Sequence, residues 1–263
     1  DFYLDHGGNG YNTLMRDFEM GGEDESYFKK DSGGSIKRFL DDFIPRYEAA
    51  KGKGYISFIT CNHDTCRPSY NLDKTELKLA YAFLITMPGV PFVYYGDEIG
   101  MRYIADQPTK EGGYTRTGSR TPMQWTRNDN LGFSDAPKDK LYLPVDTDPA
   151  APVADEEMED PDSLYNTVRE LLNLKRMDDS LDADADFEVL YSSADADAFL
   201  YRRGGYLIVV NPYGREFKHT LRIRISKKLF EIGNVSAQDN DGKGKEFVIT
   251  SGIQSFAAFE LKR

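Results

Sequence analysis

Apolar residues in the first part of the chain follow two different spacings. One set recurs at helical intervals on a single face: Ile36, Phe39, Leu40, Phe43 and Tyr47. This spacing predicts a helix that Ser35 caps at its start. Pro45 should kink or end the helix, because proline has no amide hydrogen for the helical bond. The next apolar run, residues 55–60, is rich in β-branched and aromatic side chains and predicts a strand.

A second helix and a second strand follow. Apolar side chains again share one helical face, at Leu77, Ala80, Tyr81, Leu84 and Ile85. Asp73 is the predicted N-cap, and the Pro88–Gly89 pair should stop the helix. Residues 90–95 then form a continuous apolar and aromatic run that ends at Gly96. Strands of this kind, separated by helices, are typical of a parallel sheet that is buried on both faces.

Residues 101–161 sustain neither spacing. Glycine, proline, asparagine and aspartate are dense there, and residues 155–162 are strongly acidic. Loops in compact domains have a median of about 4–6 residues, so this stretch is either a disordered linker or a functional loop. Its first half carries large apolar side chains that do not suit a solvated linker: Tyr114, Met123, Trp125, Leu131 and Phe133. We therefore expect an ordered loop over a site, followed by a solvated acidic surface.

The period of the pattern changes to two later in the chain. The last predicted helix covers residues 163–175, with Asp162 as its cap. Short strand candidates separated by turn residues follow, at 187–191, 198–202, 206–211, 217–225, 246–250 and 254–261. They predict a small antiparallel sandwich. With a boundary near residues 178–182, the expected domains are residues 1–180 and 181–263.

Charge and composition argue against several classes of function. The chain of 263 residues has 33 Lys and Arg against 44 Asp and Glu, a net charge of −11. This charge repels a phosphate backbone, so no nucleic-acid partner is expected. No apolar run reaches the roughly 18 residues of a membrane span. Two cysteines exclude a disulfide scaffold, and together with three histidines they have no zinc-ligand spacing, so no metal site is predicted.

The sharpest polar cluster is Cys61-Asn62-His63-Asp64, directly after the predicted strand 55–60. The carboxyl ends of parallel strands face the ligand site, where a histidine and an aspartate can bind a polyhydroxyl substrate. The carboxylate can also stabilise developing positive charge. Alternatively, the cluster is a turn in which the asparagine and aspartate satisfy local backbone groups, and the four residues favour neither interpretation. A Cys–His nucleophile is disfavoured because nothing suggests an oxyanion hole.

A second cluster, Tyr94-Tyr95-Gly96-Asp97-Glu98, ends the next predicted strand. The two adjacent acids could act as an acid and a base. Neighbouring residues of a strand point to opposite faces, however, so at most one of the two would face a shared site. We favour a structural role, either hydrogen bonding within the turn or pairing with an arginine.

Three motifs together resemble a known family. They are residues 58–64 (FITCNHD), residues 87–101 (MPGVPFVYYGDEIGM), and residues 120–125 (RTPMQW) with 130–134 (NLGFS). In this order and at this spacing they resemble the α-amylase superfamily, glycoside hydrolase family 13. Within it the chain is most similar to the branch of oligo-1,6-glucosidases, α-glucosidases and trehalose synthases. The resemblance runs from the first residue through the last strand.

The resemblance implies an α/β fold: the C-terminal part, about strands six to eight, of a (β/α)8 TIM barrel, followed by an all-β antiparallel sandwich domain. Strand six would end in residues 1–5. Strand seven would end at the triplet 62–64, and residues 92–95 would form strand eight. The stretch 101–161 would be the loop after strand eight, over the active site.

The resemblance also implies roles for single residues. Asp64 would be the third carboxylate of the family, which binds the sugar in subsite −1 and stabilises the transition state. His63 would hydrogen-bond the hydroxyls of that sugar. Arg116 matches an arginine that closes the non-reducing end of the pocket, and Arg67 matches a substrate-binding arginine more loosely. Supporting roles would fall to Asn62, Asp97, Glu98 and Arg120.

Retaining glycosidases need two further carboxylates, about 5–5.5 Å apart, which in this family stand at the ends of strands four and five, before Asp1. The implied function is the C-terminal portion of a retaining α-glucosidase or transglucosylase that acts on α-glucosidic bonds of oligosaccharides. The chain alone is expected to be inactive. The alternative is a non-catalytic α-amylase-like protein that binds carbohydrate or a protein partner.

The expected partners are an α-glucan or disaccharide substrate and the N-terminal part of the barrel. An opened barrel would otherwise expose its sheet edges. No cofactor is expected in this chain, because the Ca²⁺ loop of some relatives also lies in the N-terminal part. Two unpaired cysteines favour a cytoplasmic location. A weaker alternative places starch binding on aromatic residues of the sandwich: Phe187, Tyr191, Tyr201 and Tyr206.

Overall fold

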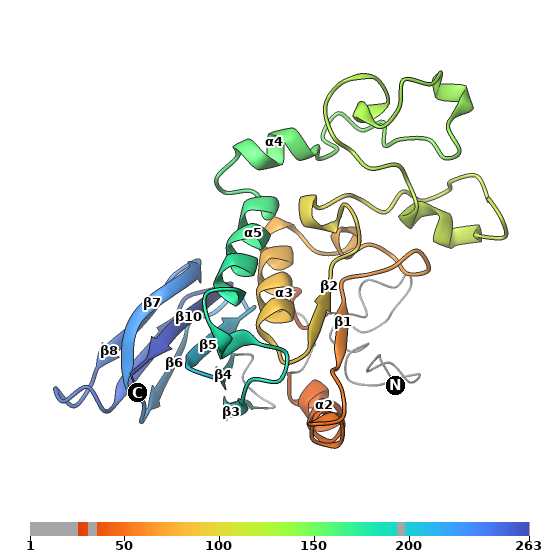
Figure 1. The fold of residues 1–263 in the computed structure, drawn as a ribbon. Coiled ribbons are helices and arrows are strands. Elements are labelled where there is room, and N and C mark those ends of the chain that lie inside the picture. Colours follow the sequence, from red (N-terminus) through yellow and green to blue (C-terminus); the bar gives the residue numbers. More distant parts are fainter. Residues whose placement is uncertain (1–25, 31–35, 194–197, 263) are drawn as a thin grey trace.

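Two short parallel strands, β1 (Ser57–Ile59) and β2 (Val90–Phe92), lie between the helices of the N-terminal half (Figure 1). The structure is a computed structural model that describes residues 26–30, 36–193 and 198–262. Ser35 and residues 1–5, for which we predicted a cap and a strand end, lie outside these ranges. Both strands are shorter than predicted, and only Phe58 is buried in them, while Phe92 is 55% exposed. The expected burial on both faces is therefore wrong, because the described residues add no third strand to this sheet.

Helix α2 (Ile36–Ala50) presents the predicted apolar face to the core, with Phe39 and Phe43 stacked 5.1 Å apart. The helix continues past Pro45, so of the two predicted outcomes, a kink or an end of the helix, the end is wrong. Loss of one backbone hydrogen bond is outweighed by burial of the residues that follow. Tyr47, beyond the proline, is 6% exposed and stacks on Phe43 at 5.7 Å.

Helix α3 (Lys74–Thr86) begins and ends as predicted. Asp73 accepts a hydrogen bond from the Glu76 amide at 2.9 Å, and the Glu76 carboxylate accepts one from the Asp73 amide at 2.9 Å. This reciprocal capping box satisfies two amides that would otherwise lack a partner. The helix ends at Met87, directly before the Pro88–Gly89 pair.

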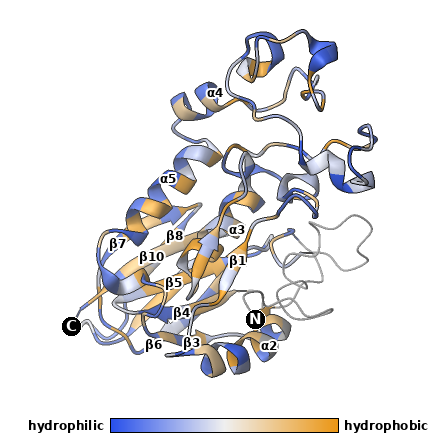
Figure 2. Cartoon of the chain, turned by 45° about the vertical axis from the view of Figure 1, so that its right-hand side comes forward, coloured by the Kyte–Doolittle hydropathy of each residue, from blue (hydrophilic) through white to orange (hydrophobic). Residues whose placement is uncertain are grey.

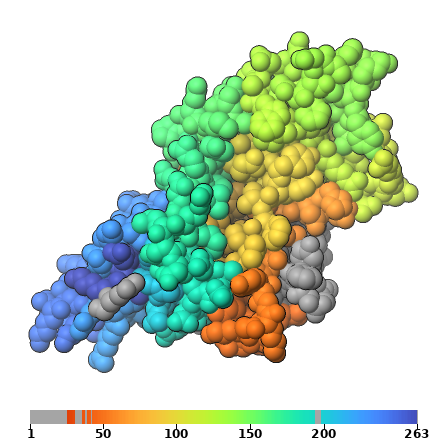
Figure 3. All heavy atoms as spheres, viewed as in Figure 1, coloured from red at the N-terminus to blue at the C-terminus, as the bar shows by residue number. Residues whose placement is uncertain are grey.

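The long segment after β2 is folded over the carboxyl ends of both strands and forms the upper part of the surface (Figure 3). Between residues 97 and 140 it contains only short 3₁₀ turns, among them Tyr114–Ser119. Arg102 ties it together by donating to Asp146 at 2.9 and 2.7 Å and to Asp148 at 2.6 Å. The acidic half is exposed, as expected, but it also forms helix α4 (Ala154–Glu159), which the sequence did not predict.

Helix α5 (Leu164–Lys175) matches its predicted range, but its N-cap is Ser163 rather than Asp162. The Ser163 hydroxyl accepts from the Asn166 amide at 2.9 Å. Asp162 instead accepts from the Lys78 ammonium at 2.6 Å and so ties the start of α5 to α3. Among the described residues, no helix is long and apolar enough to cross a membrane.

The C-terminal strands form two antiparallel sheets, confirming the predicted change of architecture. One sheet has the order β3-β4-β5-β10-β7 and the other β6-β9-β8. Their bounds are β3 (Phe187–Tyr191), β4 (Phe199–Arg203), β5 (Tyr206–Asn211), β6 (Phe217–Leu221), β7 (Ile225–Ile232), β8 (Val235–Asp239), β9 (Phe247–Ser251) and β10 (Ser255–Leu261). The predicted strand 217–225 ends earlier, as β6 at Leu221, and neither β7, of which it contains only the first residue, nor β8 was predicted. The two sheets share an apolar core that includes Leu200, Val209 and Ile249.

The outer face of the larger sheet packs on α2, α3 and α5, and apolar residues gather at this junction (Figure 2). Tyr201 is fully buried and hydrogen-bonds the Thr86 hydroxyl at 2.6 Å, while Tyr206 is 1% exposed. Neither ring can stack on starch, so this alternative is wrong for both. One hydrophobic core contains residues from both sides of the predicted domain boundary. The division of the chain into two domains at residues 178–182 therefore stays a prediction.

Gly89 allows the close approach of β1 and β2, so Gly89→Ala should be strongly destabilising. Its φ is +106°, and an added Cβ would lie 2.2 Å from the carbonyl oxygen of Ile56. We expect the substitution to lower the free energy of unfolding by more than about 3 kcal/mol in urea denaturation. Gly52 is the control, because its φ is +74° but nothing lies within 4 Å of an added Cβ. Gly52→Ala should cost only about 1–2 kcal/mol, and equal losses would contradict the clash.

Burial, with a smaller contribution from the nearby charge of Arg203, lowers the pKa of Lys175 to about 8. The ammonium donates to the carbonyl of Leu181. Between pH 8 and 10 the unfolded chain binds more protons at this lysine than the folded one, so stability gains a rising contribution with pH. Unfolding measured from pH 7 to 9.5 should therefore show a smaller rise for Lys175→Met than for the original chain. Parallel pH curves would show that this lysine is not responsible.

Candidate functional site

The candidate site lies in the loop that follows β1, at its carboxyl end. The Asn62 side chain accepts from the Asp64 amide at 2.7 Å, and the Thr65 hydroxyl accepts from the Asn62 amide at 3.0 Å. The turn interpretation therefore holds for Asn62, whose oxygen caps a local amide. It does not hold for the Asp64 carboxylate, which points outward and is 41% exposed, next to a His63 side chain that is 63% exposed.

Two arginines from the long segment converge on the Asp64 carboxylate. Arg116 donates to its Oδ1 at 2.8 Å, and Arg120 donates to the same oxygen at 3.0 Å. His63 Nε2 lies 3.2 Å from Oδ2, and Arg120 also donates to the His63 carbonyl at 2.8 Å. The structure thus brings together four of the residues selected from the sequence. With two arginines on one partly exposed carboxylate, the cluster can bind oxygen-rich ligands.

A buried ion pair lies beneath this cluster. Arg67 donates to Asp97 Oδ1 at 2.7 Å, and both side chains are fully buried. Arg67 therefore cannot contact a ligand as it stands, and the substrate-binding role expected for it does not fit the structure. For Asp97 we favoured a structural role such as pairing with an arginine, and this pairing is confirmed. The other Asp97 oxygen accepts from the Thr60 hydroxyl at 2.5 Å and from the Cys61 thiol at 3.1 Å.

Burial controls the protonation of these groups. It raises the pKa of Asp97, while the charge of Arg67 and three side-chain hydrogen bonds oppose the rise. Burial also raises the pKa of the Cys61 thiol, with a further contribution from Asp97, and raises that of Cys66 to about 12. Both thiols are therefore protonated at neutral pH, which argues against a thiolate nucleophile here.

Glu98, the other member of the predicted acidic pair, is only half-buried, and burial raises its pKa. It lines an aromatic hollow of about 420 Å³ beside Arg120, together with Trp125, Phe133 and Tyr142. The three rings are 48%, 49% and 58% exposed. The density of large apolar residues in the long segment predicted an ordered loop here and included Trp125 and Phe133. Tyr142 was not among the residues selected from the sequence.

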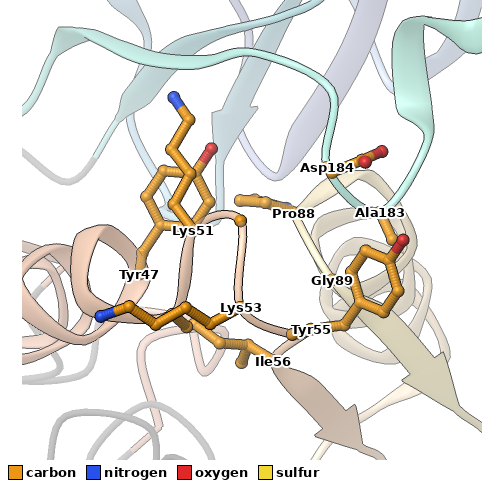
Figure 4. Close-up of a pocket in the computed structure, with 12 residues that line it drawn as sticks. Tyr47, Lys51, Lys53, Tyr55, Ile56, Pro88, Gly89, Ala183 and Asp184 are labelled. Atoms are coloured by element: carbon orange, nitrogen blue, oxygen red, sulfur yellow. The ribbon is translucent and has the colours of Figure 1, made fainter.

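A second hollow, of about 370 Å³, lies at the opposite ends of the strands (Figure 4). It is lined by the end of α2, by the residues before β1 and β2, and by Ala183 and Asp184. Figure 4 shows the Lys51 and Lys53 ammonium groups directed to different sides, so their charges do not converge. Barrel active sites lie at the carboxyl ends of the strands, so this hollow is not the candidate site.

In the part of the chain that the structure describes, no group of three His, Cys, Asp or Glu side chains could hold a metal ion. That this chain holds no cofactor, and that a calcium site lies in the N-terminal part of the barrel, both stay predictions.

Comparison with known proteins places the chain in a family. The family model "Alpha amylase, catalytic domain" matches residues 32–184. A trehalose synthase of a Pimelobacter species is 36% identical over 120 residues, which are 43% of this chain and 19% of that protein. A probable oligo-1,6-glucosidase of Bacillus subtilis is 28% identical over 201 residues, 62% of this chain and 35% of that protein.

The fold is also that of solved structures. The trehalulose synthase MutB from Pseudomonas mesoacidophila superposes with a TM-score of 0.72 at 20% identity, over 95% of this chain and 50% of that one. The chain thus spans about half the length of this barrel enzyme, and its matches cover less than that of the curated relatives. The motifs, the family model and the fold agree, and the chain belongs to the α-amylase family, glycoside hydrolase family 13.

Proposed function

We propose that this chain is the C-terminal portion of a retaining α-glucosidase or transglucosylase that acts on α-glucosidic bonds of oligosaccharides. In this proposal β1 and β2 are strands seven and eight of the barrel, and the antiparallel sheets form the C-terminal domain. The nucleophile and the general acid belong to strands that the preceding polypeptide supplies. That polypeptide is the proposed partner, and an α-glucan or disaccharide is the proposed substrate.

One observation carries the proposal, the meeting of His63, Asp64 and Arg116 at the carboxyl end of β1. The Arg116 guanidinium lies 2.8 Å from the Asp64 carboxylate although the two residues are far apart in the chain. These side chains are partly exposed, so a ligand can reach them. Exposed ion pairs contribute only about 0–1 kcal/mol to folding stability. Stability alone therefore does not explain why two arginines meet at one exposed carboxylate.

In the proposed mechanism Asp64 and His63 hold one glucose ring through its hydroxyls. As the glycosidic bond breaks, the ring flattens toward an oxocarbenium ion and its anomeric carbon gains positive charge. The Asp64 carboxylate stabilises that charge, because the electrostatic attraction is stronger in the transition state than in the bound substrate. Arg116, held by the carbonyls of Gly112 and Gly113, would fix the far end of the ring.

The names of the relatives suggest the substrate class. Trehalose synthase, maltase and oligo-1,6-glucosidase act on small α-linked glucosides, so maltose, trehalose and isomaltose are the first substrates to assay. We propose the cytoplasm as the location, because Cys61 and Cys66 are both free and a reducing compartment keeps thiols in that state.

Replacing Asp64 by asparagine in the complete protein should lower kcat for such a substrate by about 10³-fold or more, with the melting temperature preserved. Asparagine keeps the shape of the side chain but removes the charge that stabilises the transition state. Initial rates with maltose and thermal unfolding measure the two effects.

Asp160→Asn is the matched control, because Asp160 is an exposed aspartate that pairs with Lys74 at 3.2 Å, away from the site. It should keep the original rate. A near-original rate for Asp64→Asn would reject the role of Asp64. Sugar binding by a complete protein without any turnover would favour the non-catalytic alternative.

A further inference from the structure

Arg67 joins three segments that build the candidate site. Its own segment follows β1, and it donates to Asp97 Oδ1 at 2.7 Å and to the Tyr95 carbonyl at 2.8 Å, both in the turn after β2. Its second terminal nitrogen donates to the Ser119 carbonyl at 3.1 Å. Ser119 directly precedes Arg120, one of the two arginines on Asp64.

Ser119 is held from a second side as well. Its hydroxyl donates to the Thr65 carbonyl, one residue beyond Asp64, at 2.5 Å, and the residue is fully buried. The preceding Gly118 packs so closely on the Tyr103 ring that an added Cβ would lie 2.6 Å from it. The backbone next to Arg120 is thus fixed in position by buried contacts, while the Arg116 and Arg120 side chains extend toward Asp64.

We propose that Arg67 and Asp97 are a positioning pair that sets Arg120, and through the same turn Arg116, against Asp64. The proposal, which rests on the function proposed above, reassigns Arg67 from contacting substrate to orienting the residues that do. The chain of contacts runs from Asp97 to Arg67, from Arg67 to Ser119, and from Arg120 to the Asp64 carboxylate.

The chemistry of arginine suits this role. Its planar fork reaches acceptors on two segments from separate nitrogens, and the compact ammonium of lysine, whose donors share one nitrogen, cannot reproduce that spacing. The guanidinium also lies over the rings of Tyr94 and Tyr95, at 5.0 and 4.9 Å from their centres, and this restricts its orientation. A fully buried ion pair contributes little net stability compared with apolar side chains of similar volume, so fixing a geometry is the better explanation for it.

Hydrogen exchange tests the positioning without any need for activity. The Arg120 amide donates to the Thr117 carbonyl at 3.0 Å within the anchored turn. In the complete protein, Arg67→Lys should reduce protection of the amides of residues 116–120 by at least about 10-fold. The control is Arg102→Lys, which breaks the forked contact of another arginine of the long segment, the one with Asp146 and Asp148. It should leave residues 116–120 as protected as before.

A kinetic cycle tests whether Arg67 acts through Arg120. Arg67→Lys alone should raise KM for maltose by about 10- to 100-fold, because small displacements of binding groups are costly. In the Arg120→Ala background the same change should raise KM by a clearly smaller factor than it does alone, since one of the two arginines it positions is already absent. If Arg67→Lys does not fold, Asp97→Asn is the second variant, because it removes the charge that pairs with Arg67 and keeps the shape of the side chain.

The outcomes separate this proposal from the proposed function. Absence of glucosidase activity in the original complete protein would overturn the proposed function, and exchange would still decide the positioning. Unchanged protection of residues 116–120 in Arg67→Lys, or in Asp97→Asn where Arg67→Lys does not fold, would overturn the positioning role. Additive effects of Arg67→Lys and Arg120→Ala on KM would overturn it too, because independent residues add.

Discussion

The ion pair between Arg67 and Asp97 is the contact on which the candidate site depends. It is fully buried and lies where the carboxyl ends of β1 and β2 meet. The cost of removing both charges from water is offset only if their remaining donors and acceptors are satisfied. Here the Thr60 hydroxyl, the Cys61 thiol and the carbonyls of Tyr95 and Ser119 provide most of those partners. The same bonds that make the burial tolerable therefore connect the segments around Asp64.

A second buried arginine works at the opposite end of the strands with different chemistry. Arg203, on β4, donates to the carbonyl of Thr86 at 2.9 Å and to that of Asp182 at 2.6 Å. Its partners are neutral carbonyls, and burial lowers its pKa. Burial also acts to lower the pKa of Arg67, but there the charge of Asp97, its hydrogen bond and the other neighbouring acidic groups together exceed the effect of burial and raise the pKa. One arginine fixes the antiparallel sheet to α3, and the other fixes the loops of the site to each other.

The sequence predicted the features that depend on local periodicity and on motifs. The apolar faces of α2 and α3, the Asp73 cap and the antiparallel C-terminal sheets follow from spacings that a single segment contains. Helix α4 was missed because its residues are acidic and exposed, and an exposed helix carries no apolar stripe. The cap of α5 was misplaced by one residue, since both Asp162 and Ser163 are good caps and only the pairing of Asp162 with Lys78 decides between them.

Long-range contacts explain what the sequence could not provide at the site. The motifs selected Asp64, His63, Arg116 and Arg120, which do meet. Nothing in the spacing of Arg67 shows that it turns inward to Asp97, because this depends on the packing of two strands that are distant in sequence.

The surface beside β2 also depends on contacts between distant segments. There Val93, Val168 and Leu172 line an apolar hollow of about 420 Å³ that Glu98 also borders. Aliphatic side chains of α5 and of the residue after β2, beside an edge that no described strand covers, are suited to packing against a further strand and helix rather than against a sugar. In the proposed enzyme, closing the barrel along this edge would bury Val93 and bring the two upstream carboxylates to the end of the strands at which Asp64 already stands.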